Sequence, residues 1–194
     1  MSNIKQSKAI VIILSAPSGG GKSSIAKSLL QNDSKLVKSI SVTTRPPRSQ
    51  EKEGVQYFFK DKSSFEEMIV KGELLEYAVI YNNLYGTPKN YVKNKLNEGF
   101  DILFDIDYQG ACQIKKKIKN CRMVSIFIMP PTLEILRKRI EDRGQDDKEA
   151  IKLRMKCAEE EISHAKNYDY TVINSNFEET VKTIQEIITK ERSI

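Results

Sequence analysis

The sequence predicts an α/β fold in which a mainly parallel sheet is flanked by helices and carries a small inserted lobe. Three observations support this prediction. Short apolar runs rich in β-branched residues alternate with amphipathic segments along most of the 194 residues, and a glycine-rich turn follows the first run. The stretch over about 45–97 interrupts this rhythm with short strands and turns. Alternation favours parallel pairing, because each parallel connection needs a crossover segment.

The elements expected in the N-terminal half are strands over 9–15, 36–42, 57–59 and 74–80 and helices over 23–31 and 63–72. The first strand is an uninterrupted apolar run, so it should be buried on both faces. Ser63 and Ser64 each stand three residues before a glutamate, the spacing of a capping box. A helix should therefore begin at Ser63 and end at Gly72.

The elements expected in the C-terminal half are strands over 101–106, 123–129 and 170–173 and helices over 89–98, 107–117, 132–143, 147–166 and 177–191. Gly99 and Gly144 follow two of these helices as stops, and Pro130 ends a strand. In the last helix an apolar stripe recurs at helical spacing through Phe177 and Val181, as expected for a helix packed on a sheet.

Composition excludes several classes of protein. Hydrophobic residues make up 39% and charged residues 30%, which argues against a disordered or fibrous chain. No apolar run is long enough for a membrane span or a signal peptide, so we expect a cytoplasmic protein. Three cysteines without CxxC spacing and one histidine argue against a disulfide framework and a zinc site. The net charge of +6 suits anionic partners.

A phosphate-binding loop is the strongest motif. The eight residues Ala16-Pro-Ser-Gly-Gly-Gly-Lys-Ser23 match the P-loop pattern GxxxxGK[ST] except at Ala16. Glycines let backbone N–H groups point at a polyphosphate, while the lysine reaches its terminal phosphates and the serine hydroxyl holds Mg²⁺. The alternative is a surface turn that contains a lysine by chance. The strand before the motif and the helix after it favour nucleotide binding.

Further motifs extend from Ser41 almost to the C-terminus. They are Ser41-Val-Thr-Thr-Arg-Pro-Pro-Arg48, Gly54-x-x-Tyr57-Phe58, Leu75-Glu-Tyr-Ala78, Leu84-Tyr-Gly-Thr87, Asp105-Ile-Asp-x-Gln-Gly110, Ile128-Met-Pro-Pro131, Arg139-x-x-x-Arg143-Gly144 and Tyr168-Asp-Tyr170. With these motifs the sequence resembles guanylate kinases of the bacterial type, which are P-loop nucleoside-monophosphate kinases. The resemblance implies transfer of the ATP γ-phosphoryl to GMP, giving ADP and GDP, with Mg²⁺ accompanying ATP. It also implies one domain with a core over 8–44, 98–138 and 168–194, a GMP-binding lobe over 45–97 and a lid over 139–167.

The resemblance implies two groups of ligand-binding residues. For GMP they are Ser41, Arg45, Arg48, Tyr57, Glu76, Tyr85, Thr87 and Asp107. For ATP they are Ala16, Pro17, Ser18, Gly19, Gly20, Gly21, Lys22, Ser23, Ser24 and Asn174. Guanidinium forks suit a nucleotide phosphate, and a carboxylate such as that of Glu76 suits the N1–H and 2-amino group of guanine.

The implied catalytic residues are Lys22, Arg139, Arg143 and Arg154, whose charges would stabilise the transferring phosphoryl group. Ser23 and Asp105 are the implied metal-side residues, and the division of roles between Asp105 and Asp107 is left open. The arginines at 139 and 143 are four residues apart, so an ordinary pair on an exposed helix face is the alternative.

Three other functions compete with this interpretation. A kinase for AMP or dTMP would share the P-loop but lack the guanine set, and a protein-binding module of this fold would have lost the P-loop glycines or lysine. Only the net positive charge of the chain suggests a nucleic-acid binder. We therefore expect ATP and GMP as partners, with no nucleic acid and no membrane. The sequence leaves open both dGMP as a second acceptor and a homo-oligomer.

Overall fold

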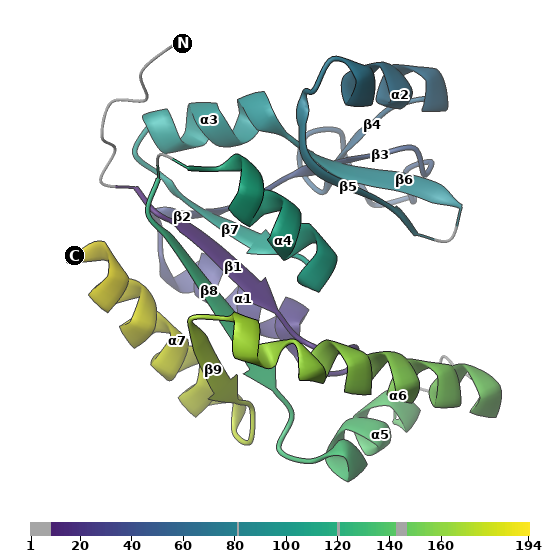
Figure 1. Cartoon of the computed structure of the whole chain (residues 1–194), viewed down its shortest axis with the longest axis vertical. Coiled ribbons are helices and arrows are strands. Elements are labelled where there is room, and N and C mark those ends of the chain that lie inside the picture. Colours follow the sequence, from purple (N-terminus) through teal and green to yellow (C-terminus); the bar gives the residue numbers. More distant parts are fainter. Residues whose placement is uncertain (1–8, 81, 120, 143–146) are drawn as a thin grey trace.

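A five-stranded parallel sheet forms the centre of the part of the chain that the structure describes. The computed structural model describes residues 9–80, 82–119, 121–142 and 147–194. The strand order is β2 (Leu36–Lys38), β7 (Asp101–Asp105), β1 (Val11–Ser15), β8 (Met123–Met129) and β9 (Tyr170–Ile173) (Figure 1). The predicted α/β class and mainly parallel sheet are confirmed.

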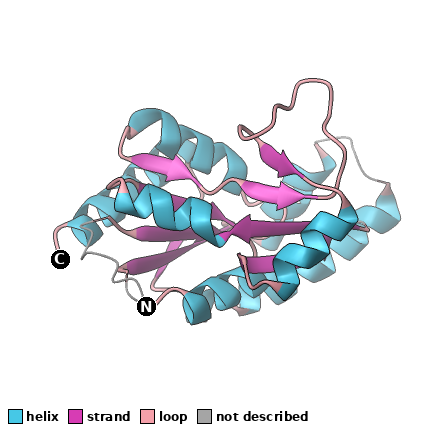
Figure 2. Ribbon diagram, turned by 90° about the horizontal axis from the view of Figure 1, so that it is seen from above, coloured by secondary structure: helices cyan, strands magenta, loops and turns pink. Residues whose placement is uncertain are grey.

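Helices cover both faces of this sheet (Figure 2). On one face lie α1 (Lys22–Asn32) and α7 (Phe177–Arg192), and on the other lie α3 (Lys89–Asn97) and α4 (Tyr108–Lys117). Strand β1 contributes Ile12 and Leu14 to the first core and Val11 and Ile13 to the second. This is why the strand reads as an apolar run without a polar face.

A smaller sheet packs beside the first. Its order is β4 (Tyr57–Phe59), β3 (Ser41–Thr43), β6 (Asn83–Pro88) and β5 (Leu74–Ile80), which leaves β5 at an edge. Helix α2 (Lys62–Val70) covers it by inserting Phe65, which is fully buried against Val42 and Leu74. The sheet is mixed, because β3 pairs in parallel with β4 while β6 runs antiparallel to β3 and β5.

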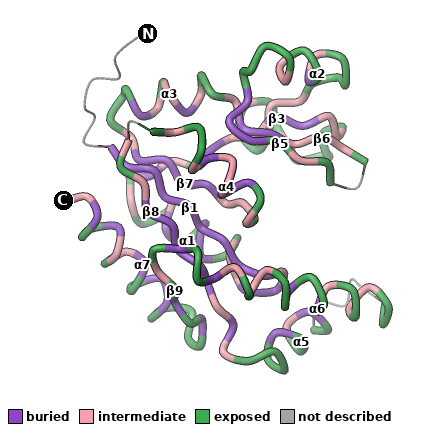
Figure 3. The backbone as a smooth tube through the Cα atoms, in the orientation of Figure 1, coloured by how far each residue is buried: buried purple, intermediate pink, exposed green. Residues whose placement is uncertain are grey.

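Two further helices extend from the central sheet, as the tube in Figure 3 shows. Helices α5 (Leu133–Glu141) and α6 (Lys148–Ser163) pack through a small core of Leu136, Ile140, Met155 and Ala158. A 3₁₀ turn (Ala165–Asn167) then leads to β9. Among the described residues, no helix is both long and apolar enough to cross a membrane.

Several predicted elements need correction. The single strand expected over 36–42 is wrong, because β2 pairs with β7 in the central sheet whereas β3 pairs in the smaller one. Strand β6 was not predicted, since its glycine and proline weaken the strand pattern. The helix expected from 132 begins at Leu133 and ends at Glu141, before Arg143 and Gly144, which lie outside the described residues.

The capping box predicted at Ser63 and Ser64 is also wrong. Asp61 is the N-cap of α2, and its side chain accepts hydrogen bonds from Ser64 N and from the hydroxyls of both serines. A carboxylate at this position satisfies an amide of the first turn and interacts favourably with the helix dipole. The serines therefore lie inside the first turn instead of capping it.

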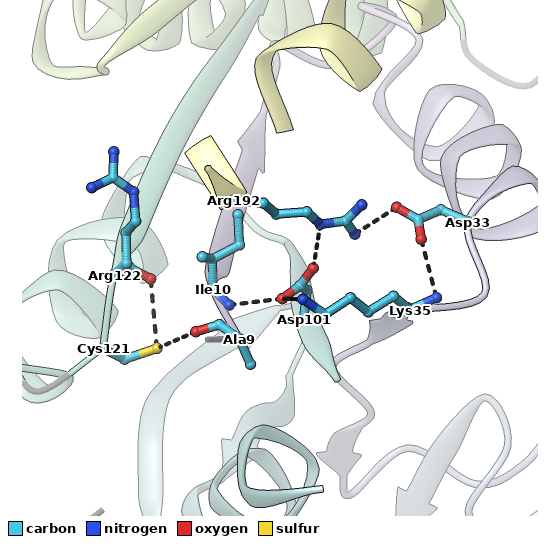
Figure 4. Close-up of polar contacts among 8 residues, drawn as sticks. All are labelled: Ala9, Ile10, Asp33, Lys35, Asp101, Cys121, Arg122 and Arg192. Atoms are coloured by element: carbon cyan, nitrogen blue, oxygen red, sulfur yellow. Dashed lines mark hydrogen bonds and ion pairs between the residues drawn. The ribbon is translucent and has the colours of Figure 1, made fainter. Parts of the chain in front are cut away.

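Asp101 is a fully buried carboxylate that ties the C-terminal helix to the central sheet (Figure 4). Its Oδ1 accepts from the Ile10 amide at 2.8 Å and its Oδ2 from Arg192 Nε at 2.6 Å. Arg192 also donates to Asp33 at 2.6 Å, and Lys35 Nζ lies 3.7 Å from Asp101. A buried charge is tolerated only with such partners.

We expect Arg192→Met to lower the free energy of unfolding by about 2 kcal/mol, because Asp101 stays buried without its closest cationic partner. The expected loss is smaller than the full cost of breaking a buried ion pair, because Asp101 keeps Lys35 and the Ile10 amide as partners. Urea denaturation would measure the change. Lys182→Met, at an exposed position of the same helix, is the control. Equal stability of both variants would contradict the prediction.

Candidate active site

The glycine-rich loop between β1 and α1 lines a cavity of about 270 Å³ with residues 16–24. Gly19 and Gly21 have φ angles of 87° and 92°, in the left-handed region that disfavours a side chain. A Cβ at Gly21 would also lie 2.6 Å from Asn174 Nδ2. The two glycines thus shape a loop whose backbone can face an anion at the start of α1.

Asn174 lies buried against this loop. Its Nδ2 donates to Gly20 O at 2.9 Å, and its Oδ1 accepts from Thr180 Oγ1 at 3.2 Å. The structure therefore places the residue where it holds the backbone of the phosphate loop. Arg139, from α5, donates to Asn174 O at 3.0 Å.

Lys22, at the start of α1, forms an ion pair with Asp105, at the end of β7. Lys22 Nζ lies 3.0 Å from Asp105 Oδ1, and Lys38 Nζ lies 3.6 Å from Oδ2. The strands β1 and β7 are neighbours, with Leu14 in register with Asp105, so the loop and the acid meet at the carboxyl ends of adjacent strands. Lys38 was not predicted, because nothing in its local sequence indicates that it reaches Asp105.

Helix α6 carries one cationic and one anionic side chain to the phosphate loop. Arg154 Nη1 donates to Ser18 Oγ at 3.0 Å. Glu161 also lines the cavity, and burial raises the pKa of its carboxyl while the charge of Lys22 opposes that rise. Glu161 was missed because it stands in an acidic run that resembles an exposed helix face. Arg143, the remaining predicted arginine, lies outside the described residues.

A second cluster forms in the smaller sheet around Arg45. One guanidinium nitrogen of Arg45 lies 2.8 Å and 2.9 Å from the two carboxylate oxygens of Glu51, which also accepts from the Arg48 amide. The Arg45 guanidinium lies 5.5 Å from the Tyr57 ring centroid, and Tyr57 meets Tyr85 edge to face at 5.9 Å. Hydrogen bonding to Arg45 lowers the pKa of Glu51.

Glu51 was not predicted, although it stands three residues after Arg48. The side chain of Arg48 is exposed, so of the predicted pair of arginines it is Arg45 that Glu51 holds in place. Ser41 is half-buried at the start of β3, in register with Tyr57. These residues converge on one side of the smaller sheet.

Glu76 is a buried carboxylate on β5, 7% exposed. Thr87 Oγ1 donates to its Oε1 at 2.7 Å. Burial raises the pKa of Glu76, while the Thr87 hydrogen bond and the charge of Lys117 oppose that rise and the charge of Asp107 adds to it. The second carboxylate oxygen of Glu76 can accept a hydrogen bond from an N–H group of a ligand.

Asp107 begins α4 two residues after Asp105. Its Oδ1 accepts from the Gly110 amide at 2.8 Å as the N-cap of the helix. Asp107 therefore has a capping role that its motif alone does not reveal. The connection from β7 to α4 brings Asp105 toward Lys22 and Asp107 toward Glu76.

Comparison with known proteins identifies the family that this chain resembles. The family model described as guanylate kinase matches residues 8–191. The chain is 55% identical to a protein named guanylate kinase from Rickettsia felis, over 96% of each chain. It is 46% identical to one from Clostridioides difficile, over 96% of this chain and 90% of that one.

A solved structure supports the same assignment. The crystal structure of guanylate kinase from Anaplasma phagocytophilum has a TM-score of 0.74 and 37% sequence identity, and the match covers 97% of this chain and 88% of that one.

Proposed function

The chain belongs to the guanylate kinase family, and on this premise we propose how its residues transfer the γ-phosphoryl of ATP to GMP. As a nucleoside-monophosphate kinase it yields ADP and GDP. One observation carries the assignment of residues. Lys22 of the phosphate loop pairs with Asp105 at the end of β7, and two residues later the charge of Asp107 acts on the buried carboxylate of Glu76, which accepts from Thr87.

On the ATP side, the backbone N–H groups of residues 18–24 and the ammonium of Lys22 bind the phosphates. In the structure Lys22 is paired with Asp105, and ATP would draw it toward the β- and γ-phosphates. Arg139 donates to Asn174, which is bonded to the loop, and Arg154 donates to Ser18 within it, which supports a role for both in binding the transferring group. Arg143 joins them by its place in the motif. Their charges stabilise the transition state.

Ser23 and Asp105 fit a magnesium ion that accompanies ATP, because hydroxyl and carboxylate oxygens are the donors that this ion prefers. Ser23 stands at the exposed start of α1, and Asp105 is the carboxylate beside the loop. Bound Mg²⁺ neutralises phosphate charge during transfer.

On the GMP side, Arg45, Arg48, Tyr57 and Tyr85 bind the acceptor phosphate. Glu51 holds the Arg45 guanidinium before the nucleotide arrives, so less side-chain freedom is lost on binding. The second pKa of a phosphate monoester is near ~6, so the acceptor oxygen is largely ionised at neutral pH and needs no general base.

The base is recognised by Glu76, Thr87, Ser41 and Asp107. Glu76 accepts from guanine N1–H and the 2-amino group, while Thr87 fixes one of its oxygens. Adenine offers neither donor in that place. A buried site built to bind a donor rejects a base that lacks it.

The experiment that tests this function is a coupled assay of ADP formation with ATP and each of GMP, AMP, dTMP and UMP, with dGMP as a further acceptor. GMP should be preferred by at least about 10³-fold over AMP. Preference for another acceptor would assign a different kinase. GMP binding without ADP formation would identify a binding module.

We propose that α5 and α6 form a lid that excludes water during transfer, since ATP would otherwise be hydrolysed. Arg154 already bridges α6 to Ser18 of the loop. A non-hydrolysable ATP analogue together with GMP should slow amide exchange in α6 by about tenfold or more. Mass spectrometry of peptides from Lys148–Ser163 would measure this, with β1 as the unaffected control. Equal exchange with and without both ligands would contradict the lid.

A further inference from the structure

Strand β5 is irregular where it carries Glu76. Leu74 pairs with Pro88 and Tyr77 with Gly86, so three steps along β5 match two along β6 and the register shifts between them. One extra residue in β5 therefore makes a β-bulge at Leu75 and Glu76. Leu74 packs with Val42 and Phe65, and a regular strand would place Glu76 on that same face, because residues two apart share a face. The extra residue lets Glu76 turn away from that face, and its carboxylate accepts from Thr87 instead.

A bulge disturbs the ladder of hydrogen bonds, so the strand around Glu76 needs other partners. On the β6 side, Gly86 lets the two backbones approach closely, because a Cβ there would lie 2.8 Å from Glu76 O. On the other side β5 is the edge of its sheet, and its backbone groups have no neighbouring strand among the described residues.

Helix α4 supplies these partners with two side chains. Gln113 Oε1 accepts from Tyr77 N, and Gln113 Nε2 donates to Tyr77 O, each at 3.2 Å. Lys117 Nζ donates to Leu74 O at 3.0 Å. The two side chains are four residues apart and so lie on one face of the helix. Their contacts flank the bulge on both sides.

We propose that Gln113 is a positioning residue for guanine recognition, acting through the backbone of β5 on the carboxylate of Glu76; this inference rests on the proposed function. Its amide replaces the missing neighbouring strand at Tyr77 and holds the bulge in the conformation that aims Glu76. Lys117 acts in the same way at Leu74. The helix that bears them is capped by Asp107, two residues after the Asp105 that pairs with Lys22, so the recognition of guanine is linked through α4 to the end of β7.

Gln113→Met tests this proposal, because it keeps the length of the side chain and removes both hydrogen bonds. We expect the KM for GMP to rise about five- to tenfold, the scale of two lost hydrogen bonds, with the KM for ATP within about twofold of wild type. If Gln113 contributed only to stability, its replacement would not raise the KM for GMP selectively over the KM for ATP. Lys116→Ala, at an exposed position of the same helix, is the control and should change neither constant.

A double-mutant cycle shows whether the effect passes through Glu76. In a Glu76→Gln background, Gln113→Met should change the KM for GMP by less than about twofold. An unreduced effect in that background, or no effect of the single variant on the KM for GMP, would overturn the proposal. Failure of the proposed function is a separate result, since the wild-type chain would then show no GMP-dependent ADP formation.

Discussion

Lys22→Ala is expected to lower kcat for ADP formation by about 10²- to 10³-fold, the effect of removing a charge directed at the transferring phosphoryl group. The fold should persist. Lys22 and Asp105 are both largely buried, but Asp105 is not fully buried as Asp101 is, and it retains Lys38 at 3.6 Å. The loss should therefore be about 1 kcal/mol, which corresponds to a fall in Tm of about 2–4 °C.

Steady-state kinetics and a thermal melt of the same preparation would measure both quantities. Lys27→Ala is the matched control, because Lys27 is an exposed lysine of the same helix. Near-normal kcat in Lys22→Ala with a normal melt would show that the loop does not bind the phosphates that react.

Glu76→Gln is expected to reduce kcat/KM for GMP by about 30- to 1000-fold, which corresponds to about 2–4 kcal/mol of lost transition-state binding. Thr87 Oγ1 donates to one Glu76 oxygen at 2.7 Å and can still donate to the amide oxygen of glutamine. The amide nitrogen would then face the base and present donors to the donors of guanine. The value of kcat/KM for AMP should fall much less, because that amide can donate to adenine N1.

The same variant should be at least as stable as the wild type near neutral pH. Burial is the largest cause of the raised pKa of Glu76, so the charged form is disfavoured in the folded state. The contribution of this group to stability therefore falls as pH rises through its folded pKa, and a neutral glutamine avoids that loss. A thermal melt of Glu76→Gln and wild type at about neutral pH tests the sign, and a lower Tm of the variant would contradict it.

Specificity is measured as the ratio of kcat/KM for GMP to that for AMP. Glu73→Gln, an exposed carboxylate near the start of β5, is the control and should leave the ratio unchanged. If Glu76→Gln lowers kcat/KM for both substrates by the same factor, Glu76 has only a structural role. Guanine would then be recognised by Ser41, Thr87 and Asp107.

The sequence predicted those features that depend on neighbours along the chain. Strands β4, β5, β8 and β9 have the predicted bounds, because their apolar runs end at glycine, proline or polar residues. The phosphate loop could be identified from eight consecutive residues, since its glycines and lysine act within one turn. The motifs also indicated the family, which the comparisons confirm.

The tertiary structure alone decided how distant residues pair. The ion pair of Lys22 with Asp105 joins two strands, and the bond of Thr87 to Glu76 crosses two others. The contacts of Gln113 with Tyr77 join a helix of the central sheet to the edge of the smaller one. The same holds for the separation of β2 from β3, where the two residues Ser39 and Ile40 connect one sheet to the other.

The physical reason is the range over which each signal acts. Glycine turns and apolar periodicity are set by residues a few positions apart, so they can be recognised in the sequence. Contacts between residues far apart in the sequence form only after the backbone has folded and the sheets have packed. Examples are the ion pair of a carboxylate with a distant lysine and the bonds of a side-chain amide to a β-bulge. Glu51, Glu161, Lys38 and Gln113 look like ordinary surface residues in the sequence, and only packing brings them to the site.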